Sequence, residues 1–360
     1  MAVRRGRARG GSLALAALLA APSAGAAEPA ADFTLTPLPL PGATGIVSLD
    51  YFVYDAARRR LWVPASNTGN VDVIDVDADA VRPLAGFKTA ELEFLGKQRV
   101  IGPSSVTLGR GVAYVGNRAD SSICVVDAAT FASLGCVTVG TPAEGLAAAP
   151  DTLTYVARTR ELWVTRGAPP LGVASADLAI SVFDASRPTR PRLAGKIPLG
   201  GSAEGFAVDD RRGRFYTNVE ESGVTVAIDL HSRRVTQRWK SGCDEPHGLA
   251  LDAARGFLFV ACNARAVVLD AGRDGRVLGA IDTGEGVDNI AYLESTRTLY
   301  VAAAVAERLT VAEVDAAGVP HARHSIPTVK GTRGVVVDEL GRAYLIDPLN
   351  GRILKVSLAR

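Results

Sequence analysis

Apolar and polar residues alternate in short blocks along this chain, and the blocks repeat. A block consists of a short apolar strand, an Asn-bearing turn, a second apolar strand and a closing Asp. The clearest copies are residues 61–75, 113–127, 215–229 and 257–270. Strand-sized blocks that recur at a regular period are typical of a propeller or a solenoid.

The period can be measured from the residue that closes the second strand of each block. This marker falls at Asp75, Asp127, Asp184, Asp229, Asp270, Asp315 and Ser357. The later spacings suit one four-stranded blade of about 40–45 residues, and the longer first two indicate insertions. Seven markers therefore predict an all-β, seven-bladed β-propeller of four-stranded blades.

Each unit begins with a nearly continuous apolar run, which predicts an inner strand buried on both faces. These runs are residues 51–54, 106–108, 146–148, 206–208, 249–251, 290–292 and 335–337. The last unit ends after three strands, and residues 33–38 precede the first inner strand without a partner. We expect this N-terminal strand to complete the last blade and close the ring, where Pro37 and Pro39 suit an outermost strand.

The repeated motifs resemble those of a known family. Tyr-Val-x-Asn-like turns such as residues 114–117, followed by Val-x-Val-Ile-Asp-like strands such as residues 71–75, are similar to the YVTN repeats of YncE-type bacterial seven-bladed propellers, which have WD40-like blades. The resemblance covers about residues 45–358. It implies a periplasmic binding scaffold, or a redox-accessory propeller that holds a quinone-type cofactor. It does not fix the chemistry, because propellers carry many functions.

The first 27 residues have the pattern of a secretory signal peptide. Four Arg residues precede the short apolar stretch 13–21, and the small residues Ala24, Gly25 and Ala26 offer a cleavage site. The apolar stretch is too short to span a membrane. We therefore expect residues 1–27 to be removed and residues 28–360 to form a single propeller domain in the periplasm.

The charge balance changes once this leader is set aside. The full chain has 40 Lys and Arg against 38 Asp and Glu, and the four Arg of the leader account for the basic excess. The mature domain gives no sign of binding nucleic acid or an anionic membrane, and no later stretch is apolar enough to span a bilayer. We expect a monomer whose partner is a small molecule or a periplasmic protein.

Four cysteines in an oxidising compartment indicate two disulfides. The repeat places Cys124 and Cys136 opposite each other on the third and fourth strands of one blade, within cross-strand reach. Cys243 precedes an inner strand, and Cys262 ends the strand that returns to the same face. The predicted pairs are thus Cys124–Cys136 and Cys243–Cys262, with free buried thiols as the alternative. The spacing does not suit a metal site.

One polar position per blade stands just before the inner apolar run. Its occupants are Asp50, Ser104, Glu144, Glu204, His247, Asp288 and Arg333, and Asn289 is adjacent. A Gly follows four of them, which lets backbones approach where the strands converge. We expect these polar side chains to meet at the mouth of the central channel and to form the ligand-binding site.

This ring has two interpretations. In the first, Glu204, His247 and Asp288 bind a divalent cation, calcium or zinc, which activates water or polarises a carbonyl group. The motifs look somewhat like those of gluconolactonase-like propellers, whose metal ligands would map to Glu144 or Glu204, Asp288 and Asn289. The chain would then be a metal-dependent lactonase, although His247 replaces an expected Asn and Arg333 adds a positive charge.

In the second interpretation the same residues cap backbone groups of neighbouring blades or pair with Arg333. Nothing in the chain indicates covalent nucleophilic catalysis, because there is no Gly-x-Ser-x-Gly elbow and no Gly-rich phosphate loop. Two insertions add to the ring face. Residues 90–99 are expected to form a short helix, and residues 167–177 lengthen a turn. They either roof the channel mouth or are tolerated surface insertions.

Overall fold

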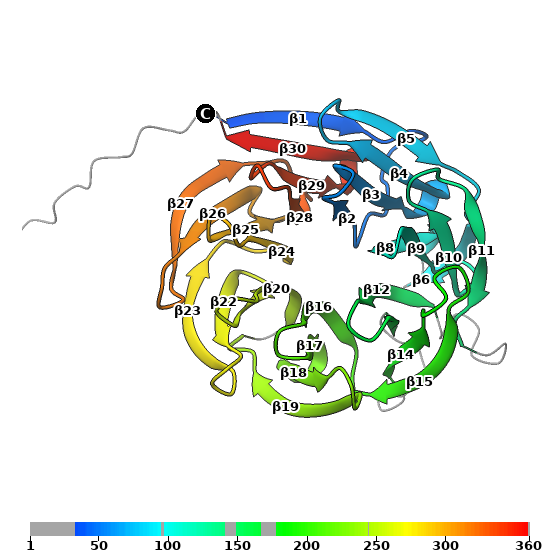
Figure 1. The fold of residues 1–360 in the computed structure, drawn as a ribbon. Coiled ribbons are helices and arrows are strands. Elements are labelled where there is room, and N and C mark those ends of the chain that lie inside the picture. The colour runs from blue at the N-terminus through cyan, green and yellow to red at the C-terminus, as the bar shows by residue number, and fades with distance from the viewer. Residues whose placement is uncertain (1–32, 95–96, 141–148, 167–177, 244, 359–360) are drawn as a thin grey trace, which may run out of the picture. The chain divides into compact units, whose positions relative to one another are not determined.

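The computed structural model describes residues 33–94, 97–140, 149–166, 178–243 and 245–358. They form seven four-stranded antiparallel sheets, and Figure 1 shows the sheets arranged around a common axis. The predicted all-β, seven-bladed propeller is confirmed. The only helical segments in these ranges are short 3-10 turns, such as η4 (Glu220–Ser222), between the second and third strands of a blade.

Each blade runs from an inner strand at the axis to an outer strand at the rim. Blades 1 to 3 consist, in order from the axis, of β2 (Val53–Asp55), β3 (Arg60–Ala65), β4 (Asn70–Asp75), β5 (Ala80–Leu84); β8 (Pro103–Gly109), β9 (Val112–Asn117), β10 (Ser122–Asp127), β11 (Ser133–Thr138); and β12 (Pro150–Val156), β13 (Glu161–Arg166), β14 (Ala179–Asp184), β15 (Arg192–Pro198).

Blades 4 to 7 follow the same plan, except that the outer strand of blade 7 comes from the start of the domain. They are β16 (Ala203–Asp209), β17 (Arg214–Val219), β18 (Val224–Asp229), β19 (Arg234–Lys240); β20 (Pro246–Asp252), β21 (Phe257–Cys262), β22 (Arg265–Asp270), β23 (Arg276–Asp282); β24 (Val287–Leu293), β25 (Thr298–Ala303), β26 (Arg308–Val314), β27 (Pro320–Pro327); and β28 (Arg333–Val337), β29 (Ala343–Asp347), β30 (Arg352–Leu358), β1 (Phe33–Pro39).

The core lies between the blades, over their second and third strands. Every residue of β21 is buried, and the middle of β22 is too. The expected burial on both faces holds for β8 and β12, which are mostly buried, but β16 alternates buried with half-buried residues and β24 is mostly half-buried. One face of each of these strands packs on a neighbouring blade, and the other is turned to the partly solvated axis. Polar side chains there can therefore meet a ligand.

Ring closure follows the predicted scheme. Strand β1 pairs antiparallel with β30 along its whole length, from Phe33 opposite Leu358 to Pro39 opposite Arg352. Leu38 and the following Leu40 are 4% exposed and join a cluster that also contains residues of blade 1. The N-terminal strand thus holds blade 7 and blade 1 together.

The expected helix over residues 90–99 is wrong. This segment forms an antiparallel hairpin instead, with β6 (Ala90–Phe94) paired to β7 (Lys97–Ile101). The residue types favour a helix, but apolar and polar residues alternate along 90–94 with a period of two, which is the strand pattern. The other insertion, residues 167–177, lies outside the described residues.

Both predicted disulfides are present. Cys124 on β10 stands directly opposite Cys136 on β11, and Cys243, just before blade 5, is bonded to Cys262 at the end of β21. Each bond therefore lies within one blade or its entry loop. Across the described ranges, the structure has no helix that is long and apolar enough to cross a membrane.

Candidate functional site

The first residues of the inner strands converge at one end of the axis. We call Asp50, Tyr51, Glu204, Asp288 and Arg333 the axial cluster; they come from blades 1, 4, 6 and 7. All five side chains are half-buried. A ring position recurs ten residues before the second strand begins in six of the blades, for example at Glu204 before Arg214 and Asp288 before Thr298. The repeat itself thus brings these groups together.

Tyr51 crosses the axis. Its hydroxyl donates a hydrogen bond to Oε2 of Glu204 over 3.1 Å and accepts one from the backbone N–H of Gly205 over 3.1 Å. Its ring also stacks on Phe206, with centroids 6.4 Å apart. Because Tyr51 belongs to blade 1 and these partners to blade 4, which faces it across the ring in Figure 1, the side chain bridges the centre of the propeller.

Arg118 joins three blades on one side of the cluster. It follows the last residue of β9 in blade 2, and its guanidinium pairs with Asp50 of blade 1, over 3.3 Å, and with Asp151 of blade 3. Burial raises the pKa of Asp50 to about 6; Arg118 acts in the opposite direction, and Asp288 adds to the rise. The carboxylate of Asp50 is thus held by one cation and repelled by another acid.

Arg333 plays the matching part on the other side. Its guanidinium lies 2.8 Å from Oδ2 of Asp288 in blade 6 and donates to the backbone oxygen of Leu49 over 3.4 Å. Burial lowers the pKa of Arg333, but the negative charges of Asp288 and Asp50 outweigh it, so that the net shift is upward. Arg333 therefore remains a cation, and its positive charge is largely balanced by the neighbouring carboxylates.

Glu204 is the group that the two arginines leave uncompensated. Burial raises its pKa to about 8, and the charges of Asp50 and Asp288 push in the same direction. Tyr51 opposes the shift with its hydrogen bond, but the balance stays upward. At pH 7 the Glu204 carboxyl therefore carries a proton, because a further negative charge beside two others is unfavourable.

The remaining described ring residues make contacts between neighbouring blades, and one of them, Ser104, caps a backbone group with its side chain. The buried hydroxyl of Ser104 in blade 2 donates to the carbonyl oxygen of Pro150 in blade 3 over 3.0 Å. The carbonyl oxygen of His247 in blade 5 accepts from the side chain of Asn218 in blade 4. Asn289 packs on the backbone of Gly248. These contacts match the structural interpretation of the ring, whereas Glu144 lies outside the described residues.

Two of the four glycines after the ring residues, Gly205 and Gly248, let neighbouring blades approach as expected; Gly334 has only ordinary contacts, and Gly145 lies outside the described residues. Gly205 has φ +62°, and a Cβ on it would lie 2.6 Å from Cα of Gly248 in the next blade.

We expect Gly205→Ala to lower the free energy of unfolding by about 3 kcal/mol, since it adds backbone strain to a steric overlap. Gly213→Ala is the matched control, because Gly213 has φ +63° and open space around its Cβ. Urea unfolding of both variants measures the difference; equal losses would contradict the close approach.

A divalent cation does not fit these residues. Asp288 is already paired with Arg333, and among the described residues no hydrogen bond or ion pair joins the side chain of His247 to Glu204 or Asp288. Within the described ranges, no three His, Cys, Asp or Glu side chains gather closely enough to hold a metal ion. The set Glu204, His247 and Asp288, which the sequence offers as ligands, therefore supports no step that passes through a metal.

Sequence reasoning missed three members of the site. Asp151 holds the ring position of blade 3. The sequence pattern favours Glu144, seven residues earlier, for this position, because Glu144-Gly145 has the same residue types as Glu204-Gly205. Counting ten residues back from the start of β13 would have found Asp151. Arg118 and Tyr51 carry no such signal, because one lies in a turn and the other in an apolar run.

Comparisons with known proteins are informative about the fold. No protein-family model matches this chain, and no curated protein matches it in sequence. Among solved structures, a chain of a mitotic checkpoint complex aligns with TM-score 0.67 and 13% identity over 97% of this chain and 99% of its own. Hydrazine synthase from Kuenenia stuttgartiensis gives TM-score 0.67 and 13% identity over 89% and 99%. Virginiamycin B lyase from Staphylococcus aureus gives 0.65 and 13% over 91% and 100%. At such identities these structures support the seven-bladed fold alone.

Proposed function

We propose that this protein is a periplasmic binding scaffold of the YncE type, and that its axial cluster binds a small ligand carrying an amine or guanidinium group. One observation carries this proposal, namely that Glu204 stands uncompensated among acids, with its pKa raised to about 8. The propeller fold is compatible with binding. The repeat motifs support the YncE-type assignment, and the two disulfides support an oxidising compartment such as the periplasm.

The charge count explains the choice of a cation. Four carboxyl groups, those of Asp50, Asp151, Glu204 and Asp288, surround two guanidinium groups, those of Arg118 and Arg333. A ligand cation beside Glu204 would supply the missing positive charge and let this carboxyl ionise. Because the side chains are half-buried, a ligand can reach them while part of the water is excluded, which strengthens a charged hydrogen bond.

Binding should therefore release a proton. At pH 7 the free site holds Glu204 protonated, and a bound cation lowers the pKa of Glu204, so affinity rises with pH between 6 and 8.5. We expect putrescine, measured by calorimetry in buffers of different ionisation enthalpy, to bind with release of close to one proton at pH 7. The neutral analogue 1,4-butanediol should not bind.

Two variants separate the site from general charge effects. Glu204→Gln cannot ionise and should lower the affinity for putrescine at pH 8.5 about tenfold or more and abolish proton release. Glu294→Gln removes an exposed acid in the turn after β24 and should behave as the parent. Equal binding by Glu204→Gln and the parent would refute a site at the axial cluster.

A further inference from the structure

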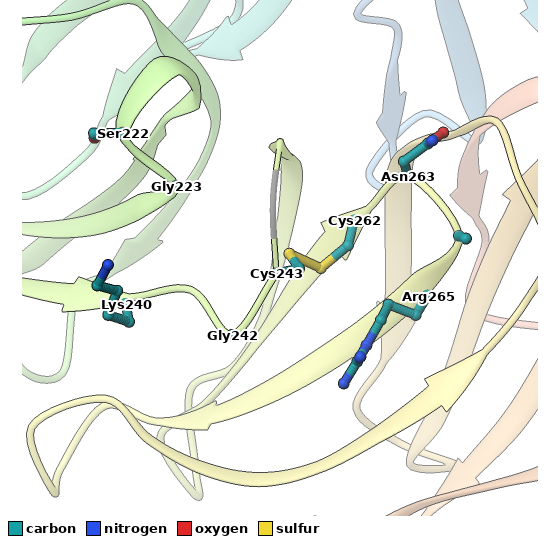
Figure 2. Close-up of a pocket in the computed structure, with 9 residues that line it drawn as sticks. Ser222, Gly223, Lys240, Gly242, Cys243, Cys262, Asn263 and Arg265 are labelled. Carbon is teal, nitrogen blue, oxygen red and sulfur yellow. A yellow bond between two sulfur atoms is a disulfide. The ribbon is translucent and has the colours of Figure 1, made fainter.

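A pocket lies between blades 4 and 5. It has a volume of about 510 Å³ and is lined by the end of β19, the loop that enters blade 5 and the turn between β21 and β22. Figure 2 shows the Cys243–Cys262 disulfide in the middle of this lining, with Lys240 and Arg265 on either side of it. We call this site the disulfide pocket.

The disulfide pocket presents two cations that have no counterion among the described residues. Lys240 comes from blade 4 and Arg265 from blade 5, and both are exposed. Neither side chain forms an ion pair or a hydrogen bond with any described residue, although Arg265 stands opposite Asp282 in the strand register. Two unpaired cations from separate blades that line one cavity suggest a recognition site for an anion.

Neutral donors complete the lining. Oδ1 of Asn263 accepts from the N–H of Gly286 over 3.2 Å, which leaves its amide nitrogen as a donor. Gly223 and Gly242 contribute backbone without side chains, so a ligand can approach the main chain closely. A pocket of this volume suits a small molecule, and the two charged side chains in its described lining, Lys240 and Arg265, are hydrogen-bond donors.

We propose that the disulfide pocket binds a small oxyanion, either a polycarboxylate or a phosphate, that bridges Lys240 and Arg265. A guanidinium binds carboxylate and phosphate oxygens in a fork, and an ammonium adds a point charge. The site is independent of the axial cluster, where the excess charge is negative.

The disulfide supplies a direct readout of occupancy. An anion seated between Lys240 and Arg265 covers the Cys243–Cys262 bond and slows its reduction by dithiothreitol. Cys124–Cys136, whose Cys136 is exposed on β11 of blade 2, serves as the internal control in the same molecule. Differential alkylation followed by mass spectrometry measures both rates, with citrate and pyrophosphate as separate probes.

We expect citrate or pyrophosphate to slow reduction of Cys243–Cys262 at least about fivefold and to leave Cys124–Cys136 unchanged; the more protective probe identifies the anion class.

Lys240→Gln and Arg265→Gln should each raise about tenfold the ligand concentration that gives half of the full protection. Arg234→Gln, at the other end of β19, is the matched control and should retain it. Equal slowing of both disulfides, no slowing by either probe, or full protection in Lys240→Gln would overturn the proposal. None of these outcomes bears on putrescine binding at Glu204.

Discussion

Removal of residues 1–39 should abolish stable folding of the propeller, whereas removal of residues 1–27 alone should not. The longer deletion takes away β1, which pairs with β30 through seven residue pairs. It also removes Leu38, which is buried between blades 7 and 1. Burial of one leucine is worth about 1.5–3 kcal/mol, and the lost strand pairing adds to this. The sum approaches the whole stability of a typical domain, about 5–15 kcal/mol.

The exposed edge of β30 offers a way to show that strand loss is the cause. A seven-residue edge with unpaired backbone groups is a template for association, so we expect the longer deletion to aggregate. A synthetic peptide of residues 33–39 added during refolding should pair with β30 and restore a cooperative transition in circular dichroism. The same peptide with Leu38 replaced by Ser should not. A stable monomer without β1 would contradict the closure.

Asp72→Asn should stabilise the protein, and the gain should grow with pH. Asp72 is fully buried in blade 1, and neither carboxyl oxygen has a hydrogen-bond partner among the described residues. Its strand neighbour Val63 lies in the apolar cluster between blades 1 and 7. Burial raises the pKa of Asp72 to about 7. The folded protein therefore holds this group as a neutral acid in conditions where the unfolded chain ionises it.

The sign of the pH effect follows from this shift. Below about pH 4 both states bind the proton and Asp72 has no effect; as the pH rises from 4 to 7 the unfolded state gains by ionising, and stability falls. Above pH 7 the loss in the free energy of unfolding that Asp72 causes levels off at about 4 kcal/mol. Asparagine stands in for the neutral acid, so the stability difference between Asp72→Asn and the parent should rise from near zero at pH 4 to about 4 kcal/mol at pH 8.

Urea unfolding at pH 4.5, 6 and 8 measures this difference. Asp210→Asn, an exposed substitution in the turn after β16, is the control and should show a small difference that does not follow this course. A constant difference between Asp72→Asn and the parent across the three pH values would mean that Asp72 is ionised in the folded protein.

The fold could be read from the sequence because every blade repeats the same alternation, and residues 33–38 had no other partner. The disulfides followed from the register of that repeat, as the pairing of Cys124 with Cys136 shows. The hairpin at 90–101 was missed because helix-forming residue types masked a period of two. In each case the pattern of positions was more informative than the residue types.

The site was harder to predict, because it depends on contacts between blades. The ring position placed Asp50, Glu204, Asp288 and Arg333 together, but the repeat could not show that Arg333 pairs with Asp288 or that Tyr51 crosses the axis. Such contacts join residues of different blades, and Tyr51 and Glu204 lie 153 positions apart in the chain. Residue chemistry alone therefore suggested Glu204, His247 and Asp288 as metal ligands, whereas in the structure Asp288 pairs with Arg333.

The most direct test of the central claim is the titration of the Glu204 side chain. Carbon-13 NMR of the glutamate carboxyl groups, with the Glu204 signal assigned by its loss in Glu204→Gln, measures its pKa with and without putrescine. We predict a pKa of about 8 in the free protein and a clear decrease when putrescine is bound. A pKa near the ordinary value of about 4.3, unchanged by putrescine, would contradict the account of the axial cluster as a cation-binding site.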